Sequence, residues 1–148
     1  MKISLHKMTC NDIDDILNIS KLSFSIHWSK SSIEKELTNN LADYIIAKAQ
    51  DKIVGFGGMW TILDESQITN IAVHPGYRKK GIGSVILKGL ISTCENKNVT
   101  GLTLEVRKSN AIAQKLYNKF GFIKEGIRPK YYQDNGEDAF LMWKRWQR

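Results

Sequence analysis

The stretch NIAVHPGYRKKGIG, residues 70–83, decides how this chain folds. Residues 67–73 have the pattern of a strand, His74-Pro75-Gly76 interrupts it, and from Gly81 onward apolar residues recur every three or four positions, as on an amphipathic helix. Glycines let backbone N–H groups converge on an anion, and the first turn of a helix adds a partial positive charge. The stretch therefore predicts a strand, a basic loop and a helix that together suit a pyrophosphate. An isolated Gly-x-Gly at a helix start is also typical of a simple tight turn, and neither a Walker loop nor a complete Gly-x-Gly-x-x-Gly is present.

Hydrophobic periodicity predicts the elements on both sides of this loop. Leu102, Leu104 and Val106 alternate with Thr103 and Glu105, as in a strand with one face toward a core. The expected order is a strand at 2–5, helices near 13–24 and 33–37, strands at 44–47, 53–62 and 67–73, a helix at 82–94, a strand at 102–106, a helix at 111–120, and strands at 122–127 and 139–145. This order predicts an α+β fold in which helices cover a twisted mixed sheet.

Size and composition predict a single globular domain over residues 1–148. The chain is 42% hydrophobic and 25% charged, and a chain of this length can bury about two thirds of its unfolded surface without a metal or a disulfide. Cys10 and Cys94 stand outside any CxxC or Cys/His cluster, which argues against a structural zinc site or a disulfide scaffold. The sequence begins without an apolar signal region and has no apolar run of about 18 residues, so we expect a cytoplasmic protein that does not cross a membrane.

Further segments, read together with the basic loop, resemble a known family. Residues 104–122, LEVRKSNAIAQKLYNKFGF, resemble the second half of the signature of the GCN5-related N-acetyltransferases, the GNAT superfamily. The chain is most similar to the branch that acetylates the N-terminal alanine of ribosomal proteins. That branch also shows a Trp-Ser near the first helices, as in Trp28-Ser29, and a late Tyr-Tyr followed by Glu-Asp-Ala, as in residues 131–132 and 137–139. It commonly has proline before the tryptophan, where this chain has His27.

The resemblance implies a fold and a co-substrate. The GNAT fold has a twisted, mostly antiparallel sheet with helices on both faces, and here the strands ending at Val73 and Val106 would lie side by side, parallel, and splay apart. The pantetheine arm of acetyl-CoA would lie in the gap, and the Val73 N–H would polarise the acetyl carbonyl. No metal is implied. The residues implied for binding acetyl-CoA are Ile71, Ala72, Val73, Arg78, Lys79, Lys80, Gly81, Ile82, Gly83, Ser84 and Asn110, the last of which is also placed to cap a helix.

Acetyl transfer to an amine needs a base, a stabilised oxyanion and an acid for the thiolate. Glu105 fits the base, acting through a water, and Tyr117 fits the acid, although a surface glutamate and a core tyrosine are also compatible with their positions. Cys94 lies on the apolar side of its predicted helix, so we expect it to be buried and not to act as a nucleophile. This favours direct transfer within a ternary complex.

The basicity of amines narrows the acceptor. At pH 7 roughly 10% of an α-amino group with a pKa near 8 is neutral, against about 0.04% of a lysine amine. A modest base therefore suffices for an N-terminal amine. The resemblance implies that Trp28, Tyr131 and Tyr132 shape the acceptor groove and that the partner is the N-terminal peptide of a ribosomal protein.

Two alternatives stay open. The same chemistry on a polyamine or an aminoglycoside needs carboxylates in the groove, which Asp134, Glu137 and Asp138 can supply. A non-enzymatic RNA-binding module is suggested by the net charge of +7 and by the segment WKRW at residues 143–146, which is also typical of a final strand with outward basic residues. We favour an enzyme without a nucleic-acid or membrane partner, acting as a monomer or a weak homodimer.

Overall fold

The computed structural model describes residues 1–147, so Arg148, the last residue of the predicted domain, lies outside the described part. The elements are β1 (Ile3–Lys7), α1 (Ile13–Ser23), α2 (Lys30–Leu37), β2 (Ala42–Ala49), β3 (Lys52–Ile62), β4 (Glu65–Val73), α3 (Ile82–Asn96), β5 (Gly101–Arg107), α4 (Ala111–Lys119), β6 (Ile123–Arg128) and β7 (Ala139–Arg145), with short 3₁₀ turns at Cys10–Asp12 and Pro75–Tyr77. The order of helices and strands is the one that the periodicity predicts. Across residues 1–147, no helix is both long and apolar enough to span a bilayer.

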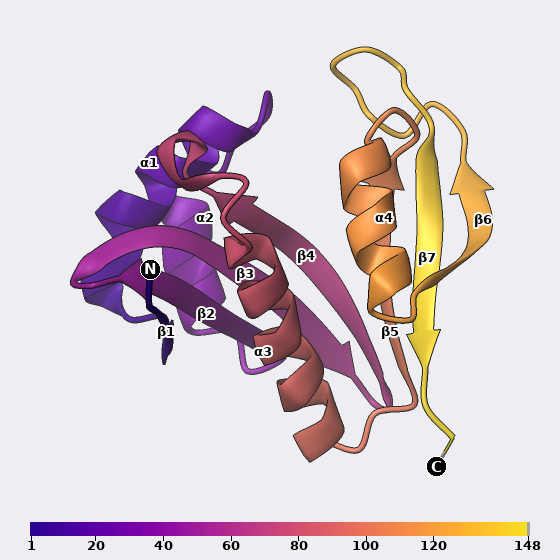
Figure 1. Ribbon diagram of the computed structural model, residues 1–148, viewed down its shortest axis with the longest axis horizontal. Helices are drawn as coiled ribbons and strands as arrows, with labels where there is room; N and C mark the ends of the chain where they lie inside the picture. The colour runs from indigo at the N-terminus through magenta and orange to yellow at the C-terminus, as the bar shows by residue number, and fades with distance from the viewer. Residues whose placement is uncertain (148) are drawn as a thin grey trace.

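The strands form one sheet in the order β1-β2-β3-β4-β5-β7-β6. Every neighbouring pair is antiparallel except β4 and β5, which run parallel. Helices α1 and α2 lie with the β1–β4 part of the sheet, and α4 lies over the β5–β7 part (Figure 1). The predicted α+β class, with a mixed and mostly antiparallel sheet, is confirmed.

The sheet separates two hydrophobic cores. The core on the α3 and α4 side includes Ile86, Leu90 and Leu104, whereas the core on the α1 and α2 side includes Ile16 and Phe56. Cys94 is fully buried in the first of these, as predicted from its place on the helix. Apolar and polar residues alternate along β5 up to Val106, so its apolar side chains fill the first core and Glu105 lies on the opposite face.

The turn between β3 and β4 differs from the sequence prediction. The strands predicted at 53–62 and 67–73 leave residues 63–66 for the turn, but Ile62 pairs with Glu65, so the turn consists of Leu63 and Asp64. Leu63 takes a left-handed conformation with φ 56° and is 95% exposed. Leucine is usually buried and rarely adopts a left-handed conformation, so the residue type gives no signal for a turn at Leu63.

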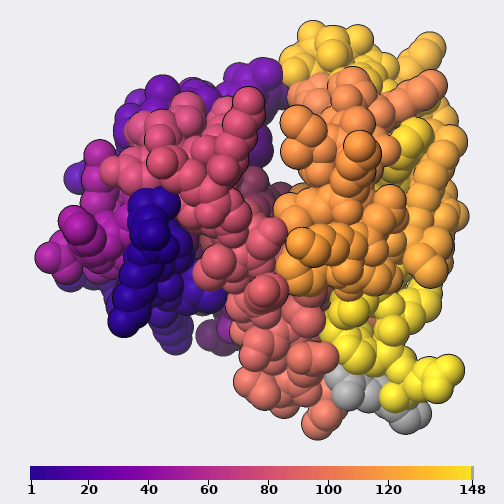
Figure 2. All heavy atoms as spheres, in the orientation of Figure 1, coloured from indigo at the N-terminus to yellow at the C-terminus, as the bar shows by residue number. Residues whose placement is uncertain are grey.

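Strands β4 and β5 separate after a very short contact. They pair only at Glu65–Gly101, Ser66–Leu102 and Gln67–Thr103. Just beyond, Ile68 pairs with Met59 and Asn70 with Gly58, so Thr69 is an extra residue in β4. Such a β-bulge bends the strand that carries it. The two strands diverge from this point (Figure 1), and the surface is hollowed between the two halves of the molecule (Figure 2).

Candidate active site

The gap between the diverging strands opens into a cleft of about 880 Å³. Its walls come from β4, β5, the start of α4 and two loops, residues 24–29 after α1 and residues 129–138 between β6 and β7. The predicted residues Trp28, Ile71, Glu105, Asn110, Tyr117, Tyr131 and Tyr132 all line it. The fold therefore brings together in one cavity residues that lie more than a hundred positions apart in the sequence.

One wall is the free edge of β4. Ala72 is buried in the core under α1, and Ile71 and Val73 pack against the core under α3. With the side chains engaged on the two faces and no pairing to β5 beyond Gln67, the backbone of this segment faces the gap. An extended ligand can hydrogen-bond to such an edge as an added strand does.

The basic loop leads into α3 through two left-handed residues. Lys79 has φ 63° and Gly81, the N-cap of α3, has φ 79°. Left-handed residues of this kind turn successive N–H groups toward a common side, and the first N–H groups of the helix have no partner within it. Lys79, Lys80 and Gly81 are exposed, whereas the side chain of Ile82 is buried, so the loop offers charge and backbone donors while anchored by one apolar residue. Gly83 and Ser84 form the partly exposed first turn.

Arg78 is engaged in the protein itself. Its Nε donates to the backbone oxygen of Val73 at 3.0 Å and its guanidinium reaches Ser23 Oγ at 3.4 Å. The side chain thus ties the end of β4 to the end of α1. Its charge remains beside the loop, but its hydrogen bonds hold the cleft wall.

Glu105 projects from β5 with only 10% of its side chain exposed. Its Oε1 accepts a hydrogen bond from Gln67 Nε2 at 3.1 Å and lies 3.5 Å from Arg128 Nε. A side-chain hydrogen bond to this carboxylate is the main cause that raises the pKa of Tyr131 to about 12. The carboxylate is therefore held from three elements at the point where β4 and β5 part.

Tyr117 lies on α4, edge-on to Phe122 at 5.7 Å between ring centroids. Burial raises the pKa of the Tyr117 phenol to about 12, with a smaller contribution from the nearby Tyr132. Asn110 begins the same helix and its Oδ1 accepts the N–H of Ala113 at 3.1 Å. Asn110 is thus an N-cap, as its sequence context allowed, and it also lines the cleft.

The three aromatic residues expected at the acceptor groove differ in how closely they are packed and how exposed they are. Trp28 is half-buried, edge-on to Tyr44 and against Phe56, so it is part of a packed wall. Tyr132 lies under the guanidinium of Arg107 at 3.9 Å from the ring centroid. Tyr131 is 46% exposed and is the most accessible of the three.

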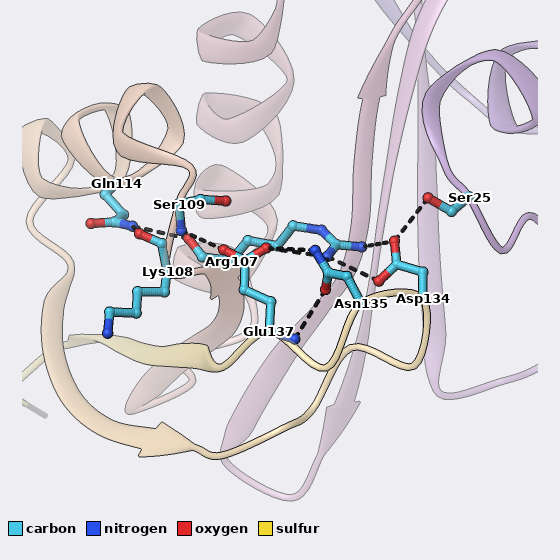
Figure 3. Close-up of polar contacts among 8 residues, drawn as sticks. All are labelled: Ser25, Arg107, Lys108, Ser109, Gln114, Asp134, Asn135 and Glu137. Carbon is cyan, nitrogen blue, oxygen red and sulfur yellow. Dashed lines mark hydrogen bonds and ion pairs between the residues drawn. The ribbon is translucent and has the colours of Figure 1, made fainter.

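An Arg107-centred network fixes the loop between β6 and β7 (Figure 3). Arg107 donates in bidentate fashion to Asp134 at 2.8 and 3.1 Å and reaches Glu137 at 3.4 Å. Ser109 N donates to Glu137 at 2.6 Å, and Ser25, across the cleft, donates to Asp134 at 2.9 Å. Hydrogen bonds from Arg107 and then from Ser25 lower the pKa of Asp134. No role was predicted for Arg107, although strand alternation places it on the same face as Glu105.

No group of three or more His, Cys, Asp or Glu side chains suited to a metal ion occurs within residues 1–147. His6, His27 and His74 each engage local partners instead. They contact Ser4 Oγ, the Trp28 carbonyl and the Gly76 N–H, respectively.

Comparisons with known proteins agree on one family. Residues 13–122 match the model of the acetyltransferase (GNAT) family. A Bacillus subtilis (strain 168) protein, provisionally named a ribosomal protein bS18-alanine N-acetyltransferase, is 41% identical over 96% of this chain and 95% of its own length. The crystal structure of the ribosomal-protein-S18-alanine N-acetyltransferase from Escherichia coli is similar with a TM-score of 0.90 and 30% identity, covering 97% of this chain and 94% of that one. A GNAT family acetyltransferase from Elizabethkingia anophelis with acetyl-CoA bound gives a TM-score of 0.78 and 25% identity, covering 97% and 98%.

Proposed function

The chain belongs to the acetyltransferase (GNAT) family, and on that premise we propose that it transfers the acetyl group of acetyl-CoA to the N-terminal amine of a ribosomal protein. The observation that carries the proposal is the cleft between β4 and β5, because it combines a free strand edge, a carboxylate and a phenol, and because the free strand leads directly into the basic loop. The relatives named above support a ribosomal protein bS18 with an N-terminal alanine as the acceptor. We further propose that the enzyme is one domain and acts in the cytoplasm as a monomer or weak homodimer.

The residues present fit acetyl-CoA. The pyrophosphate matches the basic loop and the N-terminus of α3, where Lys79 and Gly81 adopt left-handed conformations. The peptide-like pantetheine matches the unpaired edge of residues 71–73, and Asn110 lies where it can contact the same ligand. When bound, acetyl-CoA supplies an acetyl thioester and a thiol leaving group.

In the proposed mechanism, groups of the protein transfer two protons and stabilise one developing negative charge. Glu105 takes a proton from the acceptor amine through a water, the new C–N bond forms, and the Val73 N–H stabilises the charge on the acetyl oxygen. As the C–S bond breaks, the Tyr117 phenol donates its proton to the departing thiolate sulfur. A thiol ordinarily has a pKa near 8.5, so transfer from a phenol with a pKa of about 12 is uphill by on the order of 5 kcal/mol. A turnover of about 10 per second corresponds to a barrier of about 16 kcal/mol, which accommodates this step.

The Arg107-centred network favours a peptide acceptor over a polyamine. A polycation would need free carboxylates, but Asp134 and Glu137 already accept hydrogen bonds from Arg107, Ser25 and Ser109. The third candidate, Asp138, accepts from the Lys130 N–H at 3.0 Å. Binding of a polyamine to these groups would have to break existing contacts.

One thiol-release assay tests the acceptor. We expect release of coenzyme A with a peptide that begins with the free alanine of bS18. The same peptide with an acetylated N-terminus and an internal lysine, spermidine and an aminoglycoside should each give rates at least about a hundredfold lower. Mass spectrometry of the product should place the acetyl group on the α-amine. Faster turnover of spermidine or the aminoglycoside would overturn the peptide assignment.

A further inference from the structure

The side chain of Gln67 holds the carboxylate proposed as the base. Its Nε2 donates to Glu105 Oε1 at 3.1 Å, across the last point at which β4 and β5 are paired. We propose that Gln67 is a positioning residue that sets the orientation of the Glu105 carboxylate for proton transfer. This inference rests on the proposed role of Glu105.

The location explains why a side chain is needed there. Gln67 pairs with Thr103, and Glu105 is the next residue of β5 on the same face. Beyond this pair the backbones separate, so the sheet can no longer fix the distance between the two strands. The long side chain of Gln67 bridges the opening where the two strands are still close, so the position of the Glu105 carboxylate is fixed relative to β4.

The second contact to the same oxygen is looser. Arg128 Nε lies 3.5 Å from Oε1, and the Arg128 side chain is 51% exposed. Exposed ion pairs of this length fix geometry poorly. Of these two donors to Oε1, only Gln67 has hydrogen-bond geometry. Tyr131 also hydrogen-bonds to the carboxylate, so Gln67 restricts the rotation of the carboxylate from the β4 side while Tyr131 does so from the loop between β6 and β7.

The neutral charge of the donor also matters. About nine tenths of an α-amine is protonated at pH 7, so the acceptor arrives mostly as a cation. An amide fixes the carboxylate without adding positive charge on the side of β4, whereas a lysine or arginine at this position would repel the incoming ammonium.

Substitutions at Gln67 should leave the fold intact, because its side chain is exposed and belongs to neither core. Gln67→Leu removes the donor at similar size. Gln67→Glu keeps the shape but removes the donor and places a like charge beside Glu105. Glu65→Gln is the matched control, since Glu65 is exposed on the same strand and same face, two pairs before Gln67.

The experiment measures kcat and both KM values with the bS18 peptide, in the wild-type and Glu105→Gln backgrounds. We expect Gln67→Leu to lower kcat about tenfold, as loss of an orienting partner does, with both KM values within twofold. The kcat of Gln67→Glu should be lower than that of Gln67→Leu. A purely structural role for Gln67 predicts the opposite order, because Gln67→Glu keeps the shape of the side chain. In the Glu105→Gln background Gln67→Leu should change kcat less than twofold, and Glu65→Gln should match wild type.

Two results would overturn the inference, and they are distinguishable. If Glu105→Gln is slow but Gln67→Leu keeps the wild-type kcat, or lowers it equally in both backgrounds, Gln67 does not act through Glu105. If Glu105→Gln itself keeps the wild-type kcat, the proposed base is wrong and the positioning role is lost with it.

Discussion

Replacing Gly58 by alanine should destabilise the protein through one identifiable clash. A Cβ at Gly58 would lie 1.8, 2.2 and 2.6 Å from three ring carbons of Tyr44, so the ring would have to move by roughly 1.5 Å to reach ordinary contact. Overpacking of this kind costs about 1–3 kcal/mol. The displaced ring would also lose its hydrogen bond to Thr69 Oγ1, 3.1 Å away, and its edge contact with Trp28, each on the order of 1 kcal/mol.

The expected sum is a loss of about 3–5 kcal/mol in the free energy of unfolding, or roughly 6–20 °C in Tm for a chain of this size. Thermal unfolding followed by circular dichroism measures it. Gly126→Ala is the matched control, because its Cβ would meet only Leu141 atoms at 3.8 Å in another strand, so it should be neutral or stabilising by up to about 1 kcal/mol. Adding Tyr44→Ala to Gly58→Ala should cost less than the sum of the single changes. A Tm for Gly58→Ala within 2 °C of wild type would show that the ring is not fixed as described.

Three further outcomes are expected. Tyr117→Phe should lower kcat about a hundredfold or more with unchanged affinity for acetyl-CoA, measured by calorimetry and steady-state kinetics, and an unchanged kcat would remove Tyr117 from the mechanism. The pKa of Asp134 is lowered in the folded protein, chiefly by Arg107, so Asp134 contributes its full stabilisation above its ordinary pKa of 3.8 and loses it as the pH falls below that value. Between about pH 4 and pH 2, the free energy of unfolding of Arg107→Met, measured by urea titration, should therefore fall less than that of the wild type. An equal fall in the two proteins would contradict this. Glu125 pairs with Arg145 at an exposed position, so Glu125→Gln should leave Tm within about 2 °C, and a larger drop would reveal a role that the exposure does not indicate.

Much of the fold follows from local sequence pattern. The apolar positions of α3 and the alternation of β5 predict both elements and the faces they bury, because each pattern reflects a single core. The separation of β4 and β5 came from the family resemblance, and the structure confirms it. Its cause, the extra residue Thr69, has no local signal because a bulge is defined only by the partner strand.

The site was harder to predict where it depends on distant contacts. Arg107 and Asp134 are far apart in sequence, and their pairing depends on how the loop between β6 and β7 folds back. The contact between Gln67 and Glu105 likewise requires the register of two parallel strands. The left-handed conformation of Lys79 has no signal in the sequence, since lysine carries no preference for it, whereas the glycine at position 81 is typical of such a geometry.

The surplus residue in β4 has an evolutionary implication. Ile68 and Ile71 face the same core although they are three positions apart, which an uninterrupted strand does not allow. Removing Thr69 would restore regular alternation to β4. A one-codon insertion or deletion at this position therefore changes which residues of β4 face each core, and amino-acid replacements at fixed length do not make this change of parity.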